Sequence, residues 1–282
     1  MKLNDGVVNN NDYIKVLNLF SEYDFKESIE DFAFEYVIDD ERLTKLKDEF
    51  KYNDFIDEDH QFQSMVKLMV WVFHSLRGDG MCVPPSKFNA EIVLKRTKNE
   101  GLLSNCYMYA TVLNEIFLSM GFFSRMVRCM PMDLNYGDCH CVTEVYSDDY
   151  NKWVIFDAAN KAYYVDRHMI PLNLFELREA VCAQKTIYVP GMGRAQTTGL
   201  MQYWVKNLVR FESYQISRYG NESELRDSTM LHFQSKNFPV SDKTVYYKDF
   251  DIRIHHIHTS NPQLFWKRPH ERCEKVVGRA EP

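Results

Sequence analysis

The sequence predicts an α+β fold, in which a helix that begins with a cysteine packs against an antiparallel β-sheet. Two observations support this prediction. A helical pattern of apolar residues starts at Cys106, and two later segments, residues 140–146 and 152–157, have the β-branched and aromatic composition of strands. Residues 147–150 between these segments are polar and turn-prone, so we expect the two strands to pair as a hairpin.

The chain before Cys106 is predicted to be helical. Residues 10–22 and 40–50 form short, charged, amphipathic stretches, and residues 57–77 form a longer one whose apolar positions fall on one side. Gly and Pro residues at 78–85 interrupt this pattern, and a further helix is predicted over residues 87–97.

The helix that starts at Cys106 has a clear beginning, end and buried face. Ser104 or Asn105 can cap its start, and Gly121 can supply a left-handed stop. Cys106 therefore falls in the first turn, where unpaired N–H groups and the positive end of the helix dipole favour a thiolate over a thiol. The apolar or small positions follow a spacing of three and four: Tyr109, Ala110, Leu113, Phe117 and Met120, widened by Val112 and Ile116.

The hairpin is expected to place a histidine beside an aspartate. If Tyr146 pairs with Asn151, then His140 lies opposite Asp157, and opposed side chains share a face with Cβ atoms about 5 Å apart. A slip of one residue would turn one of the two side chains away. The candidate catalytic residues are therefore Cys106 as nucleophile, His140 as base and Asp157 as the group that orients the base.

Each of these residues also has a plainer interpretation. A cysteine in a helix is usually a small buried hydrophobe, a histidine in a strand is often a satisfied polar residue, and an aspartate near a strand end commonly forms a turn. The combination of all three, in this order and setting, is much less expected by accident.

After the hairpin, the sequence again predicts helices and strands in turn. Asn173 and Glu176 have the spacing of a capping box before a helix over residues 177–183, and residues 202–211 are predicted to be helical. The remaining segments alternate strand-like runs with polar turns. Among them, the histidines at 255, 256 and 258 are interpreted as a solvated polar strand.

Residues 99–181 resemble the core of the transglutaminase-like superfamily, whose members share a papain-like arrangement of Cys, His and Asp. The matching pieces are Asn105-Cys106 at a helix start, the helix end and strand over residues 120–127, and the segments 138–146 and 152–157. The resemblance implies a papain-like core with Cys106 as nucleophile, His140 as general base and acid, and Asp157 as its orienter. The sequence departs from the family at Asn105, where Gly is frequent, and at Cys141, where an aromatic residue often follows the histidine.

The resemblance also implies a domain organisation and a reaction. We expect residues 1–56 to form an N-terminal helical extension and residues 57–282 to form the transglutaminase-like catalytic domain. The expected reaction is acyl transfer on carboxamide or peptide bonds through a thioester, most simply hydrolysis by a protease or amidase. Transglutaminase-type amine transfer and peptide N-glycanase-like deglycosylation are alternatives, and a non-catalytic peptide- or carbohydrate-binding module is the alternative from another class.

Stabilisation of the oxyanion would need hydrogen-bond donors near the sulfur. The backbone N–H of Cys106 is one candidate, and Trp71, His74 and Asn89 are candidates for a second donor from upstream. Cys139 and Cys141 flank His140, but in a strand both would face the opposite side. We therefore expect no metal and no cofactor.

Composition agrees with a cytoplasmic enzyme that acts on a peptide or protein. At 282 residues and 45% hydrophobic content, the chain can bury a sizeable core. Its net charge of −6 argues against nucleic-acid binding, and no apolar run approaches the about 18 residues of a membrane span. Residues 1–6 lack an apolar signal core, and seven cysteines without a dense spacing pattern favour a reducing compartment. The sequence leaves the oligomeric state open.

Overall fold

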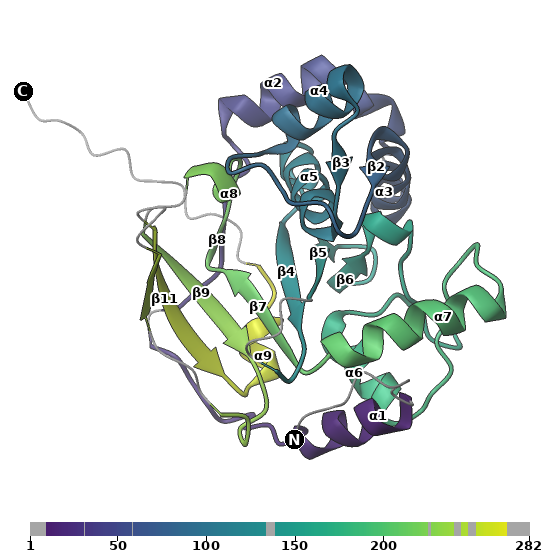
Figure 1. Cartoon of the computed structure of the whole chain (residues 1–282), viewed down its shortest axis with the longest axis vertical. Coiled ribbons are helices and arrows are strands. Elements are labelled where there is room, and N and C mark those ends of the chain that lie inside the picture. Colours follow the sequence, from purple (N-terminus) through teal and green to yellow (C-terminus); the bar gives the residue numbers. More distant parts are fainter. Residues whose placement is uncertain are drawn as a thin grey trace, which may run out of the picture.

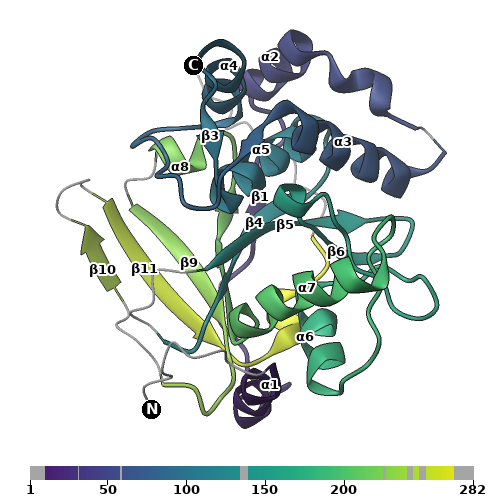
Figure 2. The same cartoon turned by 45° about the vertical axis from the view of Figure 1, so that its right-hand side comes forward.

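A seven-stranded sheet runs between two groups of helices (Figure 1, Figure 2). The computed structural model describes residues 10–30, 32–57, 59–133, 139–224, 227–239, 244–247 and 252–269. Two predictions fall partly outside these ranges. They concern the lack of an apolar signal core in residues 1–6 and residue 138 of the segment 138–146 that resembles the superfamily. The α+β class is as the sequence predicts.

The strand order in the sheet is β10-β11-β9-β7-β4-β5-β6. Five of the six pairings described between neighbours are antiparallel, and the pairing of β11 with β9 is parallel. The sheet is therefore mixed, whereas the sequence predicts an antiparallel one. The difference arises because the chain passes from β9 to the edge strand β10 and returns as β11 between them. The strands are β4 (Ser124–Met130), β5 (His140–Ser147), β6 (Lys152–Phe156), β7 (Arg210–Tyr214), β9 (Asp227–Phe233), β10 (Thr244–Tyr247) and β11 (Ile252–Thr259).

One face of the sheet is covered by the helix that carries Cys106. This helix, α5 (Cys106–Ser119), packs on β4 and β5 and is surrounded by three others (Figure 2). Because neighbours surround it, every residue from Met108 to Ser119 is buried. The surrounding helices are α2 (Glu41–Phe50), α3 (Gln61–Ser75) and α4 (Ala90–Glu100).

A second apolar core fills the other face. It includes Leu17 of α1 (Asn10–Leu19), Leu177 of α6 (Leu174–Cys182) and Trp204 of α7 (Arg194–Trp204), packed under strand residues such as Phe211. The short elements are β1 (Glu35–Tyr36) paired with β8 (Ile216–Ser217), β2 (Arg77–Gly78) paired with β3 (Leu103–Ser104), η1 (Tyr52–Phe55), η2 (Ala158–Asn160), η3 (Val205–Asn207), α8 (Asn221–Glu224) and α9 (Pro262–Phe265).

The N-terminal residues take part in both cores. Leu17 belongs to the core under α6 and α7, while Leu43, Leu46 and Tyr52 belong to the core around α5. In addition, β1 pairs in parallel with β8 from the second half of the chain. The division at residue 56 stays a prediction, and the residues before it help to build the framework that holds α5.

One predicted helix is partly wrong. Residues 202–211 are helical only as far as Asn207, and Arg210 and Phe211 begin strand β7. All five residues of β7 are buried, since the strand lies between β4 and β9 and both faces of the sheet are covered. The buried strand carries charged residues, Arg210 and Glu212, which pair with each other, so its sequence shows no run of apolar residues that would indicate a buried strand.

Candidate active site

The three predicted residues come from three elements that meet at one end of α5. Cys106 is the first residue of α5, His140 is the first residue of β5, and Asp157 directly follows β6 and caps η2. His140 and Asp157 are 1% and 0% exposed, whereas Cys106 is partly exposed. The sulfur is therefore the member of the group that lies nearest to solvent.

Local chemistry explains why α5 begins at the cysteine. The side-chain oxygen of Asn105 accepts a hydrogen bond from the backbone N–H of Met108 at 3.2 Å, which makes Asn105 the N-cap. The amide nitrogen of Asn105 donates to the carbonyl of Cys82 at 3.1 Å and fixes the cap to the preceding loop. Gly121, with φ of 80°, provides the expected left-handed residue after the helix.

The histidine and aspartate are in direct contact. His140 Nε2 lies 2.8 Å from Asp157 Oδ2, and the same carboxylate oxygen accepts hydrogen bonds from Asn160 Nδ2 at 2.9 Å and from the Tyr164 hydroxyl at 3.1 Å. Burial would raise the pKa of Asp157, but the positive charge of His140 and these hydrogen bonds outweigh it, and the pKa is lowered. The carboxylate is thus held in its charged form beside the imidazole.

The register that brings them together differs from the predicted one by two residues. Tyr146 lies opposite Trp153, not opposite Asn151, because the turn occupies residues 148–151 and Asn151 adopts a left-handed conformation with φ of 51°. Side chains alternate between faces with a period of two, so a shift of two leaves His140 and Asp157 on the same face. They meet as diagonal neighbours, not as a directly opposed pair.

The electrostatics around Cys106 favour a thiolate. Its pKa is lowered to about 5, mainly by hydrogen bonding with the thiol of Cys141 and also by hydrogen bonding with His140 and its charge, against the opposing effect of burial. Burial alone would lower the pKa of His140, but the charges of Asp157 and Cys106 and their hydrogen bonds raise it to about 10. Between these two values the site holds a thiolate beside an imidazolium.

Aromatic side chains that the sequence did not indicate enclose His140. Trp204 meets the imidazole edge-on at 4.9 Å between ring centroids, and Tyr203 does so at 5.1 Å with its hydroxyl 3.5 Å from Nδ1. The indole N–H of Trp204 donates to the hydroxyl of Tyr164, which in turn contacts Asp157. Both aromatic residues come from α7, more than sixty residues after His140, and no motif in the sequence connects them to it.

The upstream oxyanion candidates are engaged elsewhere. Asn89 caps α4 through its side-chain oxygen, Trp71 packs against Tyr52 at 5.4 Å between ring centroids, and the side chain of His74 is exposed. None of these contacts involves Cys106. The backbone N–H groups at the start of α5 are the donors that the helix itself offers beside the sulfur.

The interpretation of the later histidine group as a solvated strand is wrong. His256 and His258 lie half-buried in β11 against the buried His232 of β9, whose Nε2 is 2.6 Å from His256 Nδ1. Glu212 of β7 contacts His232 Nδ1 at 3.3 Å, so the acidic partner comes from a strand distant in sequence. Across the described residues, no group of His, Cys, Asp and Glu side chains is placed to hold a metal ion.

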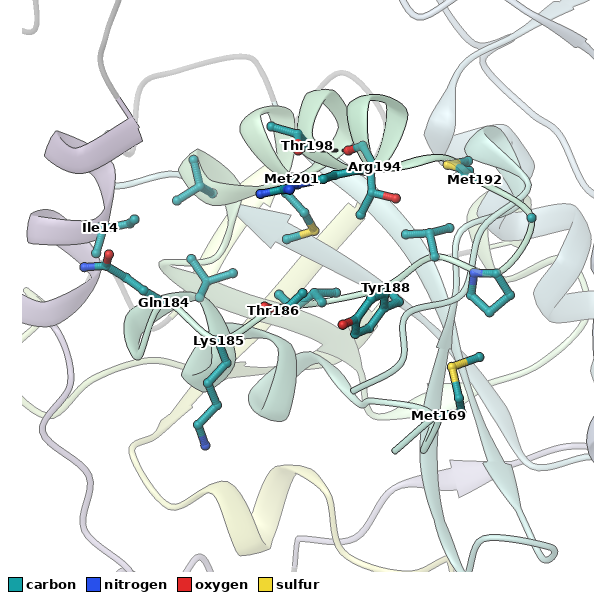
Figure 3. Close-up of a pocket in the computed structure, with 17 residues that line it drawn as sticks. Ile14, Met169, Gln184, Lys185, Thr186, Tyr188, Met192, Arg194, Thr198 and Met201 are labelled. Carbon is teal, nitrogen blue, oxygen red and sulfur yellow. Dashed lines mark hydrogen bonds between the residues drawn. The ribbon is translucent and has the colours of Figure 1, made fainter. Parts of the chain in front are cut away.

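A pocket of about 890 Å³ lies between α1, α7 and the loop that precedes α7 (Figure 3). The loop between α6 and α7 lines it together with Ile14 of α1 and Met201 of α7, while Lys185 in the close-up extends away from the labelled methionines. Cys106, His140 and Asp157 are not among its lining residues. The pocket is therefore separate from the candidate active site.

The fold and this constellation define a class: an α+β protein with a helix-start cysteine next to a buried histidine–aspartate pair. The family described as the transglutaminase-like superfamily matches residues 51–158, a range that contains Cys106, His140 and Asp157. This part of the chain is therefore similar to a transglutaminase-like core, as the sequence resemblance implies.

Other comparisons add little detail. No curated protein matches the sequence. Among solved structures, a chain from Cytophaga hutchinsonii that is described as a provisionally assigned cysteine protease is similar at 20% identity and a TM-score of 0.33. The similarity covers 52% of this chain and 46% of that chain, so it spans less than half of the neighbour's length. Separately, every helix within the described residues is too short or too polar to span a bilayer.

Proposed function

We propose that this protein is a cysteine-dependent hydrolase of amide or peptide bonds, with Cys106, His140 and Asp157 as its catalytic residues. The observation that supports the proposal best is the Asp157–His140 contact of 2.8 Å beside a thiol whose hydrogen bond to His140 helps to lower its pKa. Burying an ion pair of this kind costs desolvation free energy. Such pairs are frequent in active sites, where they set the pKa of a reactive group such as the Cys106 thiol.

Each residue has a distinct role in the proposed reaction. The thiolate of Cys106 attacks the carbonyl carbon of the amide, and backbone N–H groups at the start of α5 donate to the oxygen that becomes negative. His140 then gives its proton to the leaving amine, and a thioester remains on Cys106. Water, deprotonated by the now neutral His140, attacks the thioester and releases the acid and the free thiolate.

Asp157 acts on the orientation of the base. Its carboxylate binds Nε2 of His140, so Nδ1 is the nitrogen left to exchange a proton with the sulfur and the substrate. Asn160 and Tyr164 hold the carboxylate in place, and Trp204 packs on the ring. All six described cysteines are free thiols, and a reaction that depends on a thiolate requires its cysteine to be free. We therefore place the activity in a reducing compartment such as the cytoplasm.

The test is hydrolysis of peptide and carboxamide substrates, followed by mass spectrometry of the products. We expect the wild-type protein to release acid and amine, Cys106→Ala to be inactive, and Cys182→Ala, a control at a thiol on α6, to keep its activity. Equal activity of Cys106→Ala and wild type would overturn the proposal. Peptide binding without turnover would also overturn it, in favour of a binding module. An adduct formed only when a primary amine is added would replace hydrolysis by amine transfer.

A further inference from the structure

Two further cysteines, Cys139 and Cys141, lie near the candidate nucleophile Cys106. Cys141 lies in β5 with its side chain on the face that packs against α5, in a cluster with Ala110 and Met126. Cys106 and Cys139 pack against the same cluster. Cys141 thus faces away from His140, as the alternation of a strand requires, and toward the helix that begins with Cys106.

The contacts between these residues are close. Cys106 Sγ lies 3.9 Å from the carbonyl oxygen of Cys139. The pKa of Cys141 is raised well above its ordinary value, first by hydrogen bonding of its thiol with Cys106 and Cys139 and then by burial. All three are free cysteines. Their accessibility differs: Cys106 and Cys139 are partly exposed, whereas Cys141 is only 3% exposed.

This arrangement combines an accessible, reactive sulfur with a protected one behind it. Peroxides are attacked by thiolates and not by thiols, so the thiolate of Cys106 is the first of these cysteines to react with a peroxide that enters the site. A sulfenic acid formed there lies against the cluster that contains the Cys141 thiol, and sulfenic acids condense with nearby thiols to disulfides. Cys129, the remaining cysteine of this part of the sheet, is fully buried in the core on the other face.

We propose that Cys106 and Cys141 form a redox-sensitive modification site, which a peroxide converts into a reversible disulfide that shuts off the nucleophile. In the first step the thiolate of Cys106 attacks one peroxide oxygen, the O–O bond breaks, and hydroxide leaves to become water. In the second step Cys141 attacks the sulfenic sulfur, the S–O bond breaks, and water leaves with the proton of the Cys141 thiol. Overall, two cysteines lose one electron each and one hydrogen peroxide is reduced to two waters.

The inference rests on the proposed function, because it assigns a regulatory partner to the same reactive thiolate. The disulfide protects Cys106 from oxidation to sulfinic acid, which thiols do not reverse. It also removes the sulfur from reaction with an amide. Reduction by dithiothreitol restores both thiols.

The test reads the covalent state of Cys106, independently of activity. The wild-type protein is treated with hydrogen peroxide, unreacted thiols are alkylated, and tryptic peptides are mapped without reduction. Trypsin leaves Cys106 in peptide 99–125 and Cys129, Cys139 and Cys141 in peptide 129–152, so fragment ions between these cysteines identify the partner. We expect a Cys106–Cys141 crosslink that disappears after dithiothreitol, and retention of the crosslink in Cys139→Ser.

Several outcomes would overturn the inference. In wild-type protein these are sulfinic acid at Cys106 with Cys141 still a free thiol, or a crosslink to Cys139 in place of Cys141. The wild-type map decides the question even if Cys141→Ser, which we expect to accumulate sulfinic acid, does not fold. The two proposals can fail separately. A disulfide in a protein that does not hydrolyse amides would contradict the proposed function alone. Amide hydrolysis by a protein that forms no disulfide would contradict this inference alone.

Discussion

Replacing Asp157 by asparagine tests the electrostatic basis of the site. Asn retains the shape and part of the hydrogen bonding, but it removes the negative charge that keeps His140 protonated. Once His140 is neutral, Cys106 loses the cation that favours its thiolate, and its pKa returns toward the ordinary value of 9.0. The change should appear as an altered pH dependence of the reactivity of Cys106.

The magnitude follows from the pKa of Cys106, taking full return to 9.0 as the limit. At pH 6 a thiol with a pKa of about 5 is about nine-tenths ionised, whereas one with a pKa of 9.0 is ionised to about one part in a thousand. The wild-type thiolate is the less basic of the two and reacts intrinsically about 40- to 100-fold more slowly, because the nucleophilicity of a thiolate falls with its pKa. The wild-type protein should therefore react at most about 10- to 20-fold faster at pH 6, because the hydrogen bonding with Cys141 that lowers the pKa of Cys106 remains in the variant.

At pH 9 the order reverses. In the limit of a pKa of 9.0, the Asp157→Asn thiol is then about half ionised and carries the more nucleophilic sulfur, so it should react up to about 20- to 50-fold faster than wild type. The two rate profiles should thus cross close to neutral pH. A crossing distinguishes a shifted pKa from a simple loss of access, which would lower the rate at every pH.

The assay is the rate of alkylation of Cys106 by iodoacetamide from pH 5 to 10, read from the peptide that contains Cys106. Asp166→Asn, whose carboxylate accepts hydrogen bonds from the backbone N–H groups of His168 and Ile170 and is not bonded to His140, serves as the control and should follow the wild-type profile. Circular dichroism confirms that each variant is folded. Superimposable profiles for Asp157→Asn and wild type would refute the reasoning, because the carboxylate would then have no influence on the thiolate.

Further predictions concern the site, the core and the response to acid. Tyr164→Phe removes a hydroxyl that donates to the carboxylate of the site at 3.1 Å, so kcat should fall with KM unchanged and stability should drop by about 1 kcal/mol. Arg125→Met leaves its buried partner Glu144 without a counter-ion 2.9 Å away, and urea denaturation should show a loss of about 3–5 kcal/mol. The pKa values of His256 and His258 are lowered from 6.5 to about 4, first by burial. As the pH falls, the unfolded protein therefore binds protons at these two histidines before the folded protein does. Stability should fall as the pH drops from 6.5 toward 4, and a double His→Asn variant should show a flatter urea midpoint over that range.

The activity of the proposed hydrolase should have two pH limits. Activity should rise as Cys106 loses its proton near pH 5 and fall as His140 loses its proton near pH 10. A profile of kcat/KM with a single limb near pH 8.5 to 9 would show that the sulfur reacts as an ordinary thiol.

Features fixed by neighbouring residues could be predicted from the sequence. The N-cap at Asn105 and the stop at Gly121 depend on local hydrogen bonds and backbone conformation, and both occur in the structure. The hairpin was predictable for the same reason, and the shared face of His140 and Asp157 survived a register error of two because faces alternate with a period of two.

Features that depend on distant segments could not be predicted. The polar stretch around Asn151 admits several turns, and the observed one uses its left-handed conformation while its side chain accepts a hydrogen bond from the Tyr146 hydroxyl at 2.7 Å. The aromatic contacts of His140 come from α7, whose position is decided by the core beneath the sheet. Nothing in the sequence near His140 records that packing.

The edge-on contact between Trp204 and His140 gives the site an intrinsic optical signal. Protonated imidazole withdraws excitation energy from an adjacent indole more effectively than the neutral ring does, so emission from Trp204 follows the charge of the base. Because the chain has four tryptophans, the difference between the fluorescence titrations of the wild-type protein and Trp204→Phe follows the proton on His140 without substrate, label or turnover.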